Sequence, residues 1–131
     1  KLKIIQFYTG EIARHQIRVV TDCPSMEIVG AYVHHEAKVG IDIGEIAGIA
    51  PLGVVATNSM EEILSLDADC VLYNPPRERY DEIIPLLESG KNVISYSAGW
   101  HPNKLSSFSG VEQACQKGQS SLYRPQPRTE L

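Results

Sequence analysis

Apolar residues follow two alternating patterns along this chain. Short runs in which nearly every position is apolar predict buried strands, and longer segments with apolar residues three or four positions apart predict helices. The predicted strands are 2–7, 26–33, 54–57, 70–74, 92–96 and 120–123. The predicted helices are 11–22, 42–49, a short segment after Ser59, a segment around 80–87, and 111–117.

The alternation of strands and helices predicts the fold class. It favours parallel strands joined by right-handed crossovers. We therefore expect an α/β fold, a Rossmann-like doubly wound and mostly parallel sheet of about six strands with helices on both faces. Because ligands of such sheets bind beyond the carboxyl ends of the strands, the loops that follow the strands are the first candidates for a site.

The segment from Tyr8 to Ala13 follows the first strand and opens the first helix. The dinucleotide fingerprint G-x-G-x-x-G/A has this setting, with Gly10 as its second glycine and Ala13 in the third position. Tyr8 stands where the first glycine belongs. We expect a pyrophosphate at the helix N-terminus, unless this is an ordinary turn without a ligand. If the tyrosine ring obstructs the site, Tyr8→Gly is expected to tighten binding.

Histidines follow the second strand, where NAD-selective folds place an acid on the ribose 2′-hydroxyl. His34 and His35, with Lys38 close behind, suit a 2′-phosphate better and favour NADP over NAD. The alternative is two exposed loop histidines. No Cys, His or Asp lies at ligand spacing to complete a metal site with them. The loops after the fourth and fifth strands, which begin at Asn74 and Ser97, are either the nicotinamide side or plain turns.

Local signals predict how several helices begin and end. Ser59 and Glu62 have the spacing of a capping box. Pro85 predicts a kink or a helix that begins near Asp81, while Gly90 and Gly118 are expected to end their helices. The acidic residues at 61–62 and 78–82 are interpreted as solvated surface rather than as paired catalytic carboxylates.

Composition narrows the class of protein. The formal charge of −4 offers no general attraction to nucleic acid or to an anionic membrane. No apolar run approaches the roughly 18–20 residues of a spanning helix, and no secretory leader is evident. Cys23, Cys70 and Cys115 are isolated, so we expect partly hydrophobic packing roles for them and a reducing, cytoplasmic setting. No nucleophile elbow, phosphate-binding P-loop or zinc-protease motif is present, so no catalytic residue is assigned.

Six stretches together resemble the N-terminal domain of the dihydrodipicolinate reductase-like oxidoreductases, in particular the 2,4-diaminopentanoate dehydrogenase and native amine dehydrogenase branch. They are KIIQFYTG at 3–10, EIVGAYVH at 27–34, KVG at 38–40, DADCVLY at 67–73, GKNVI at 90–94 and VEQAC at 111–115. The resemblance implies NAD(P)-dependent hydride transfer at a C=N or amine centre. It places the cofactor on these positions: Tyr8, Thr9, Gly10, Glu11 and Ile12 at the pyrophosphate, His34 and His35 at the adenosine ribose, and Asn74, Pro75, Ser97 and Ala98 toward the nicotinamide.

Departures from the family pattern leave the function open. Besides Tyr8, the residues at 124–131 form a polar, proline-containing tail where relatives continue into a substrate domain. We therefore expect an NAD(P)-binding domain at 1–123 that is truncated relative to the family and incomplete for catalysis alone. The string H-H-x-x-K at 34–38 matches the reductase active-site motif but lies in the wrong domain, so it is interpreted as coincidence.

Three functional interpretations remain at this point: a dinucleotide-binding module, an enzyme completed by a partner chain or second subunit, and a non-catalytic remnant or interaction domain. An open edge at the sixth strand predicts a homodimer.

Overall fold

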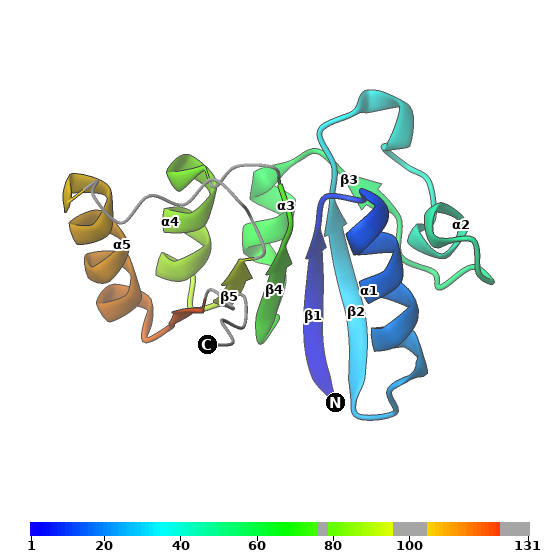
Figure 1. Cartoon of the computed structure of the whole chain (residues 1–131), viewed down its shortest axis with the longest axis horizontal. Helices are drawn as coiled ribbons and strands as arrows, with labels where there is room; N and C mark the ends of the chain where they lie inside the picture. The colour runs from blue at the N-terminus through cyan, green and yellow to red at the C-terminus, as the bar shows by residue number, and fades with distance from the viewer. Residues whose placement is uncertain (76–78, 96–104, 124–131) are drawn as a thin grey trace, which may run out of the picture.

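The sheet has the predicted class and topology. The computed structural model describes residues 1–75, 79–95 and 105–123. Its strands are β1 (Leu2–Phe7), β2 (Met26–Tyr32), β3 (Ala56–Thr57), β4 (Cys70–Tyr73), β5 (Asn92–Ser95) and β6 (Leu122–Tyr123). They form one sheet in the order β3-β2-β1-β4-β5-β6, and every neighbouring pair is parallel (Figure 1). This order reverses between β1 and β4, which makes their carboxyl ends the switch point of a doubly wound sheet.

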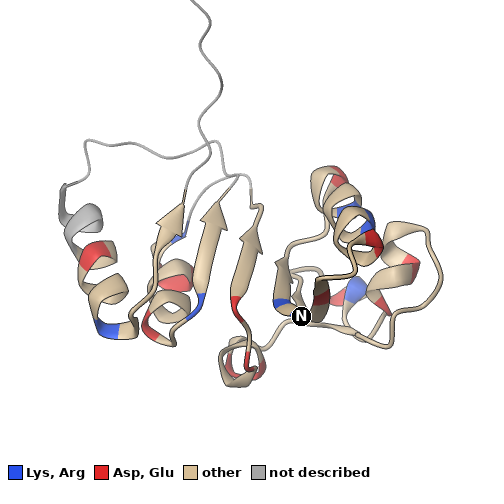
Figure 2. Cartoon of the chain, turned by 90° about the horizontal axis from the view of Figure 1, so that it is seen from below, with Lys and Arg blue, Asp and Glu red and all other residues tan. Residues whose placement is uncertain are grey.

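Helices cover both faces of this sheet (Figure 2). On one face lie α1 (Glu11–Asp22) and α2 (Ile43–Ala47), and on the other lie α3 (Met60–Ser65), α4 (Tyr80–Glu88) and α5 (Leu105–Gly118). A single 3-10 turn, η1 (Glu36–Lys38), follows β2. One face of α1 packs against the sheet, because Ala13, Ile17 and Val20, spaced three or four residues apart, are all buried.

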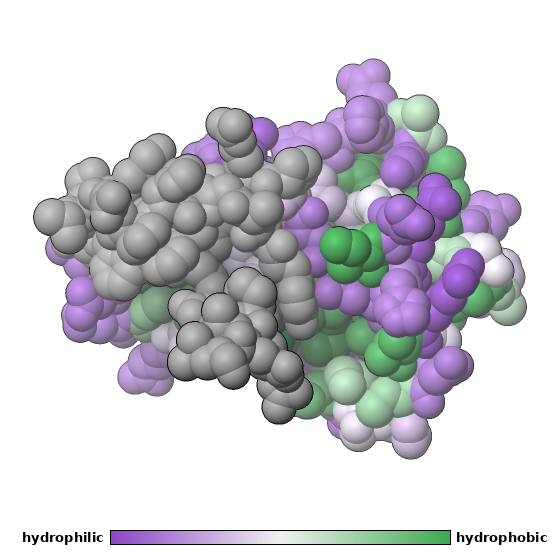
Figure 3. Space-filling view, in the orientation of Figure 1, coloured by the Kyte–Doolittle hydropathy of each residue, from purple (hydrophilic) through white to green (hydrophobic). Residues whose placement is uncertain are grey.

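Two main clusters of buried side chains fill the space between the layers. The larger one joins β1, β4 and β5 to α3, α4 and α5, with Ile5, Val71 and Leu86 fully buried. The smaller one joins β2 to α1 and α2 through Ile17 and Ile43. On the outer side of α1, Ile12 and Val19 stay more than half exposed. Figure 3 shows apolar patches standing among hydrophilic side chains on this side of the molecule.

The start of α5 corrects one sequence expectation, whereas α4 starts next to the expected Asp81 and Gly90 and Gly118 stand at the ends of their helices. Helix α4 begins at Tyr80 and continues through Pro85, and Gly90 follows it with a φ of 90°. Helix α5 begins six residues before the predicted start and ends at Gly118, while the left-handed residue after it is Gln119. Gly118 is required for another reason, because a Cβ there would lie 1.9 Å from the Leu87 carbonyl oxygen. Its missing side chain lets α5 approach α4.

Only one of the two hydrogen bonds of the predicted capping box forms. The Ser59 hydroxyl accepts the Glu62 backbone N–H at 3.3 Å. The reciprocal contact is replaced, since the Ser59 N–H is donated to the Thr57 hydroxyl at 3.1 Å. The three cysteines are free and half-buried. Within the described ranges, no helix combines the length and apolar character that crossing a membrane requires.

Candidate functional site

The turn between β1 and α1 keeps the backbone path of the fingerprint although its first glycine is a tyrosine. Tyr8 has a φ of 70°, in the left-handed region that favours glycine. A single residue other than glycine in that region costs about 1–2 kcal/mol. The Tyr8 N–H is donated to the Tyr32 carbonyl oxygen at 2.7 Å, which ties the turn to the end of β2.

Contacts of the Tyr8 side chain offset this strain. Its hydroxyl lies 2.9 Å from both carboxylate oxygens of Glu82 on α4. Its ring centroid lies 4.8 Å from that of His34 and 5.9 Å from that of Tyr32. The ring therefore leans across the ends of β1 and β2 toward α4. It does not fill the space beside Gly10, where a Cβ would meet no atom within 4 Å.

Glu82 is buried and is shared among three side chains. It is 4% exposed. Besides Tyr8, the Tyr73 hydroxyl donates to Oε1 at 2.9 Å, and His34 Nε2 lies 3.1 Å from Oε2. Burial, reinforced by the nearby Glu82 carboxylate, raises the pKa of Tyr8 far above its usual range. Burial raises the pKa of Tyr73 in the same way.

The interpretation of 78–82 as solvated surface is therefore wrong for Glu82. The buried residues of α4 are Glu82, Ile83, Leu86 and Leu87. The available signal was the spacing of Glu82 from Leu86, which is one helical turn.

The N-terminus of α1 is open to an anion. Gly10 is the N-cap residue, and no side chain caps the helix. The first N–H in the helical ladder to find a partner is that of Arg14, which is donated to the Gly10 carbonyl oxygen. The N–H groups of Glu11, Ile12 and Ala13 thus stand at the positive end of the helix dipole.

Two neighbouring helices differ from α1 in this respect. The Asp42 carboxylate caps α2 by accepting the Gly44 N–H at 2.7 Å, and Ser59 caps α3. The Asp42 carboxylate also accepts the N–H groups of Leu52 and Gly53, and these bonds lower its pKa. Helices α2 and α3 thus have side-chain caps that α1 lacks, while α4 also begins without one, at Arg79.

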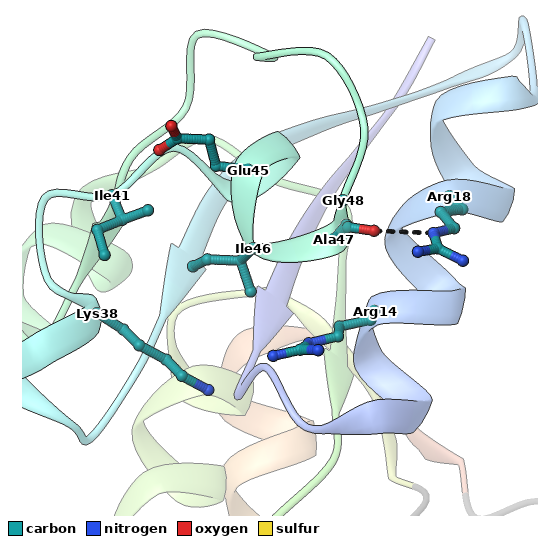
Figure 4. A pocket seen from close by; sticks show the side chains of 8 residues that line it. All are labelled: Arg14, Arg18, Lys38, Ile41, Glu45, Ile46, Ala47 and Gly48. Carbon is teal, nitrogen blue, oxygen red and sulfur yellow. Dashed lines mark hydrogen bonds between the residues drawn. The ribbon is translucent and has the colours of Figure 1, made fainter.

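Cationic side chains flank this helix end. A cavity of about 460 Å³ lies between α1 and α2 and is lined by Arg14, Arg18 and Lys38 together with Glu45. Figure 4 shows Arg14 and Lys38 extending toward each other from opposite sides. Lys38 Nζ donates to the buried Thr9 hydroxyl at 3.0 Å. Arg18 Nε donates to the Ala47 carbonyl oxygen at 2.8 Å, so its guanidinium is held on α2.

Amide side chains lie on the opposite side of the turn, next to β4. Asn74 Nδ2 donates to Gln16 Oε1 at 2.6 Å, and Gln6 Nε2 donates to the same oxygen at 3.0 Å. Pro75 is buried. Ser97 and Ala98, which were expected beside them, lie outside the described residues.

The structure thus brings most of the sequence-predicted residues to one edge of the sheet. The turn residues from Tyr8 to Ile12 lie between His34 on one side and Asn74 on the other. His35 is exposed at the start of η1. Arg14 was missed by sequence reasoning, although it lies one helical turn after Gly10. In the described part of the chain, no group of three or more His, Cys, Asp or Glu side chains could hold a metal ion.

Comparisons with known proteins identify a family for this chain. Residues 4–120 match the family described as dihydrodipicolinate reductase, N-terminus. A 4-hydroxy-tetrahydrodipicolinate reductase from Synechocystis sp. is 24% identical over 121 residues, which cover 88% of this chain and 44% of that protein. An amine dehydrogenase from Streptomyces virginiae is 34% identical over 93 residues, covering 66% of this chain and 26% of that protein.

Solved structures show the same fold. An amine dehydrogenase from Mycobacterium smegmatis superposes with a TM-score of 0.84 at 18% identity, over 93% of this chain and 38% of that one. A biliverdin reductase from Synechocystis sp., solved with biliverdin and NADP⁺, gives a TM-score of 0.72 at 16% identity, over 94% of this chain and 37% of that one. The chain spans less than half the length of each of these relatives. It belongs to the dihydrodipicolinate reductase N-terminal family, the NAD(P)-binding domains of oxidoreductases.

Proposed function

We propose that this chain binds NADP, in preference to NAD, at the carboxyl edge of the sheet. The pyrophosphate rests on the N-terminus of α1, against Thr9, Gly10, Glu11 and Ile12. The observation that carries this proposal is Gly10. Its φ of −69° is open to any residue, and a Cβ would meet nothing within 4 Å. Neither the backbone nor the packing needs a glycine there, whereas a phosphate that approaches the helix N–H groups does.

Charge beside the turn supports the preference for NADP. Arg14 and Lys38 line the cavity next to the helix N-terminus, within reach of a phosphate on the adenosine side. The residues that directly follow β2 and Val33 are His34 and His35 rather than an acid. The buried Glu82 carboxylate near His34 is already shared by three side chains, so it has little capacity left for a ribose hydroxyl.

The nicotinamide half extends from the turn toward the ends of β4 and β5. Asn74 and Pro75 stand at the end of β4. Ser97 and Ala98, which the family resemblance assigns to the nicotinamide, lie outside the described residues. The family resemblance implies hydride transfer at a C=N or amine centre, so we assign this domain the part of presenting the nicotinamide for that transfer.

The competing interpretation is a degenerate domain that binds no dinucleotide and serves in protein interaction. It rests on Tyr8 and on the polar tail at 124–131, which lies outside the described residues. The Tyr8 ring packs against His34 and α4, and the space beside Gly10 stays clear. The structural reason for a blocked site is therefore absent at this turn.

Calorimetric titration with NADPH and NADH tests the proposal, with Gly10→Asp as the informative variant. Aspartate is a favoured N-cap residue, so the variant is expected to keep its fold and stability. Its carboxylate takes the N–H groups that a phosphate needs and repels the pyrophosphate. We expect measurable NADPH binding in the wild type and its loss in Gly10→Asp. Gln116→Glu, which adds the same charge at an exposed position of α5, serves as the control. No heat with either cofactor, or equal affinity in Gly10→Asp, would contradict the proposal.

A further inference from the structure

His34 presents a flat, half-exposed ring at the point where β2 ends. The side chain is 41% exposed, although its Nε2 atom lies 3.1 Å from the buried Glu82 carboxylate. The ring also meets Tyr32 edge-on, with centroids 5.3 Å apart and planes at 80°. One edge of the imidazole is thus fixed inside the protein while part of its surface faces solvent.

The Tyr8 ring packs against the His34 ring. The two centroids are 4.8 Å apart and the planes are inclined by 33°. The Tyr8 ring is itself held by its hydroxyl at Glu82 and by edge contacts with Phe7 and Tyr73. A glycine at position 8, as in the fingerprint, offers none of these contacts, and His34 is then a loop side chain without a backing surface.

The Arg79 guanidinium lies beside the Nε2 edge of the His34 ring. Its Nη1 atom lies 3.4 Å from His34 Nε2, and its Nη2 atom pairs with Asp81 Oδ2 at 3.3 Å. The Arg79 side chain is 51% exposed. A guanidinium and an aromatic ring side by side are the two kinds of planar group on which nucleic-acid bases stack.

We propose that Tyr8 is a positioning residue that holds His34 as a stacking platform for the adenine ring of the dinucleotide. This inference rests on the proposed function, and it goes beyond it by giving the departure from the fingerprint a role. In doubly wound sheets the adenosine half lies beside the end of the second strand. His34 stands there, its supported ring is half exposed, and the N–H donors of α1 begin at Glu11, three residues after Tyr8.

The position of the platform places it beside the adenine half of the dinucleotide and away from the nicotinamide half. Tyr8 leans toward β2 and α4, whereas Asn74 and the amides of Gln6 and Gln16 lie on the α1 side next to β4. The platform therefore contributes to binding of 2′,5′-ADP, which carries only the adenosine half of NADP. It contributes nothing to binding of nicotinamide mononucleotide.

The test is titration of the full chain with NADPH and with 2′,5′-ADP, combined with proton NMR of the bound adenine. Loss of one stacked base weakens binding by roughly tenfold. We expect that loss for both ligands in His34→Ala, and recovery in His34→Phe, whose flat ring restores stacking. Tyr8→Leu is expected to weaken both ligands as His34→Ala does, while Tyr8→Phe keeps the ring and falls between. His15→Ala, an exposed histidine on α1, is the control.

The spectroscopic signature separates stacking from a merely structural role. Ring currents move the adenine H2 and H8 resonances upfield in the wild type and in His34→Phe, but not in His34→Ala. If NADPH binds His34→Ala with unchanged affinity and its adenine resonances do not move upfield on binding to the wild type, the platform is refuted while the proposed function stands. If the folded wild type binds neither NADPH nor 2′,5′-ADP, both fail together.

Discussion

The Tyr8 hydroxyl lies 2.9 Å from each carboxylate oxygen of Glu82, which joins the turn after β1 to the first turn of α4 across the edge of the sheet. The two residues are 74 positions apart in the chain. Tyr8 occupies a backbone conformation suited to glycine, and Glu82 is a buried acid that needs donors. Glu82 thus supplies a contact that offsets the strain at Tyr8, and Tyr8 supplies a hydrogen-bond donor to the buried Glu82 carboxylate.

The first prediction concerns the stability of this pair. Glu82→Gln replaces a buried charged acceptor, and we expect a loss of about 1–3 kcal/mol in the free energy of unfolding. Tyr8→Phe removes one donor and should lose about 1 kcal/mol. Urea unfolding of both single variants and the double variant measures their coupling. Glu61→Gln, at an exposed position of α3, is the control. Strictly additive losses would show that the two side chains do not interact.

The free energy of unfolding should depend on pH in the alkaline range because of the Tyr8 and Tyr73 hydroxyls. Burial raises the pKa of Tyr8 and of Tyr73 above the unfolded value of about 10. Their stabilisation is fully present below that value and is lost as the pH rises through the folded pKa, because the unfolded chain releases these protons first. The free energy of unfolding should fall by up to about 1.4 kcal/mol per pH unit for each retained proton.

Urea unfolding between about pH 9 and pH 11 measures this slope. The ultraviolet absorbance of tyrosinate reports ionisation in parallel and should rise for these groups only as the protein unfolds. A Tyr8→Phe variant should show a shallower slope than the wild type. The same slope in both would mean that Tyr8 ionises freely in the folded state.

Two glycines of α5 make a matched test of helix packing. A Cβ on Gly118 would lie 1.9 Å from the Leu87 carbonyl oxygen, so Gly118→Ala must push α5 away from α4. We expect a loss of about 1–3 kcal/mol in the free energy of unfolding. A Cβ on Gly110 would lie 3.4 Å from the tip of the Ile84 side chain. Gly110→Ala should be neutral or stabilise by up to about 1 kcal/mol. Thermal unfolding of both variants measures these changes. A Gly110→Ala variant that is less stable than Gly118→Ala would refute this packing.

Cofactor preference should depend on the two cations beside the turn. Arg14→Gln and Lys38→Gln each remove a charged donor from the cavity, and a charge-assisted hydrogen bond contributes about 1.5–3 kcal/mol. We expect about tenfold or greater weakening of NADPH binding with little change for NADH. Lys117→Gln, whose lysine pairs with Glu88 on the far helices, is the control. Equal weakening for both cofactors would place these cations at the pyrophosphate instead.

Sequence reasoning captured the fold because strand and helix periods are local and strong here. β1 and α1 have the predicted bounds, and Gly10 and Ala13 take the expected positions in the turn. The role of Glu82 could not be predicted from the sequence. Its partners, Tyr8, His34 and Tyr73, come from three strand ends that only the folded sheet brings together. The role of Gly118 could not be predicted for a similar reason, since close approach between helices leaves no mark in a single helix.

The central claim, a dinucleotide whose pyrophosphate rests on α1, is tested most directly by NMR. Backbone amide resonances of the ¹⁵N-labelled chain are followed during titration with NADP⁺. The account predicts saturable shifts that are largest at Thr9, Gly10, Glu11 and Ile12, with a second group at His34 and Lys38, and none at Lys91 or Leu122 near the opposite edge of the sheet. No saturable shift, or shifts confined to residues away from the turn after β1, would contradict it.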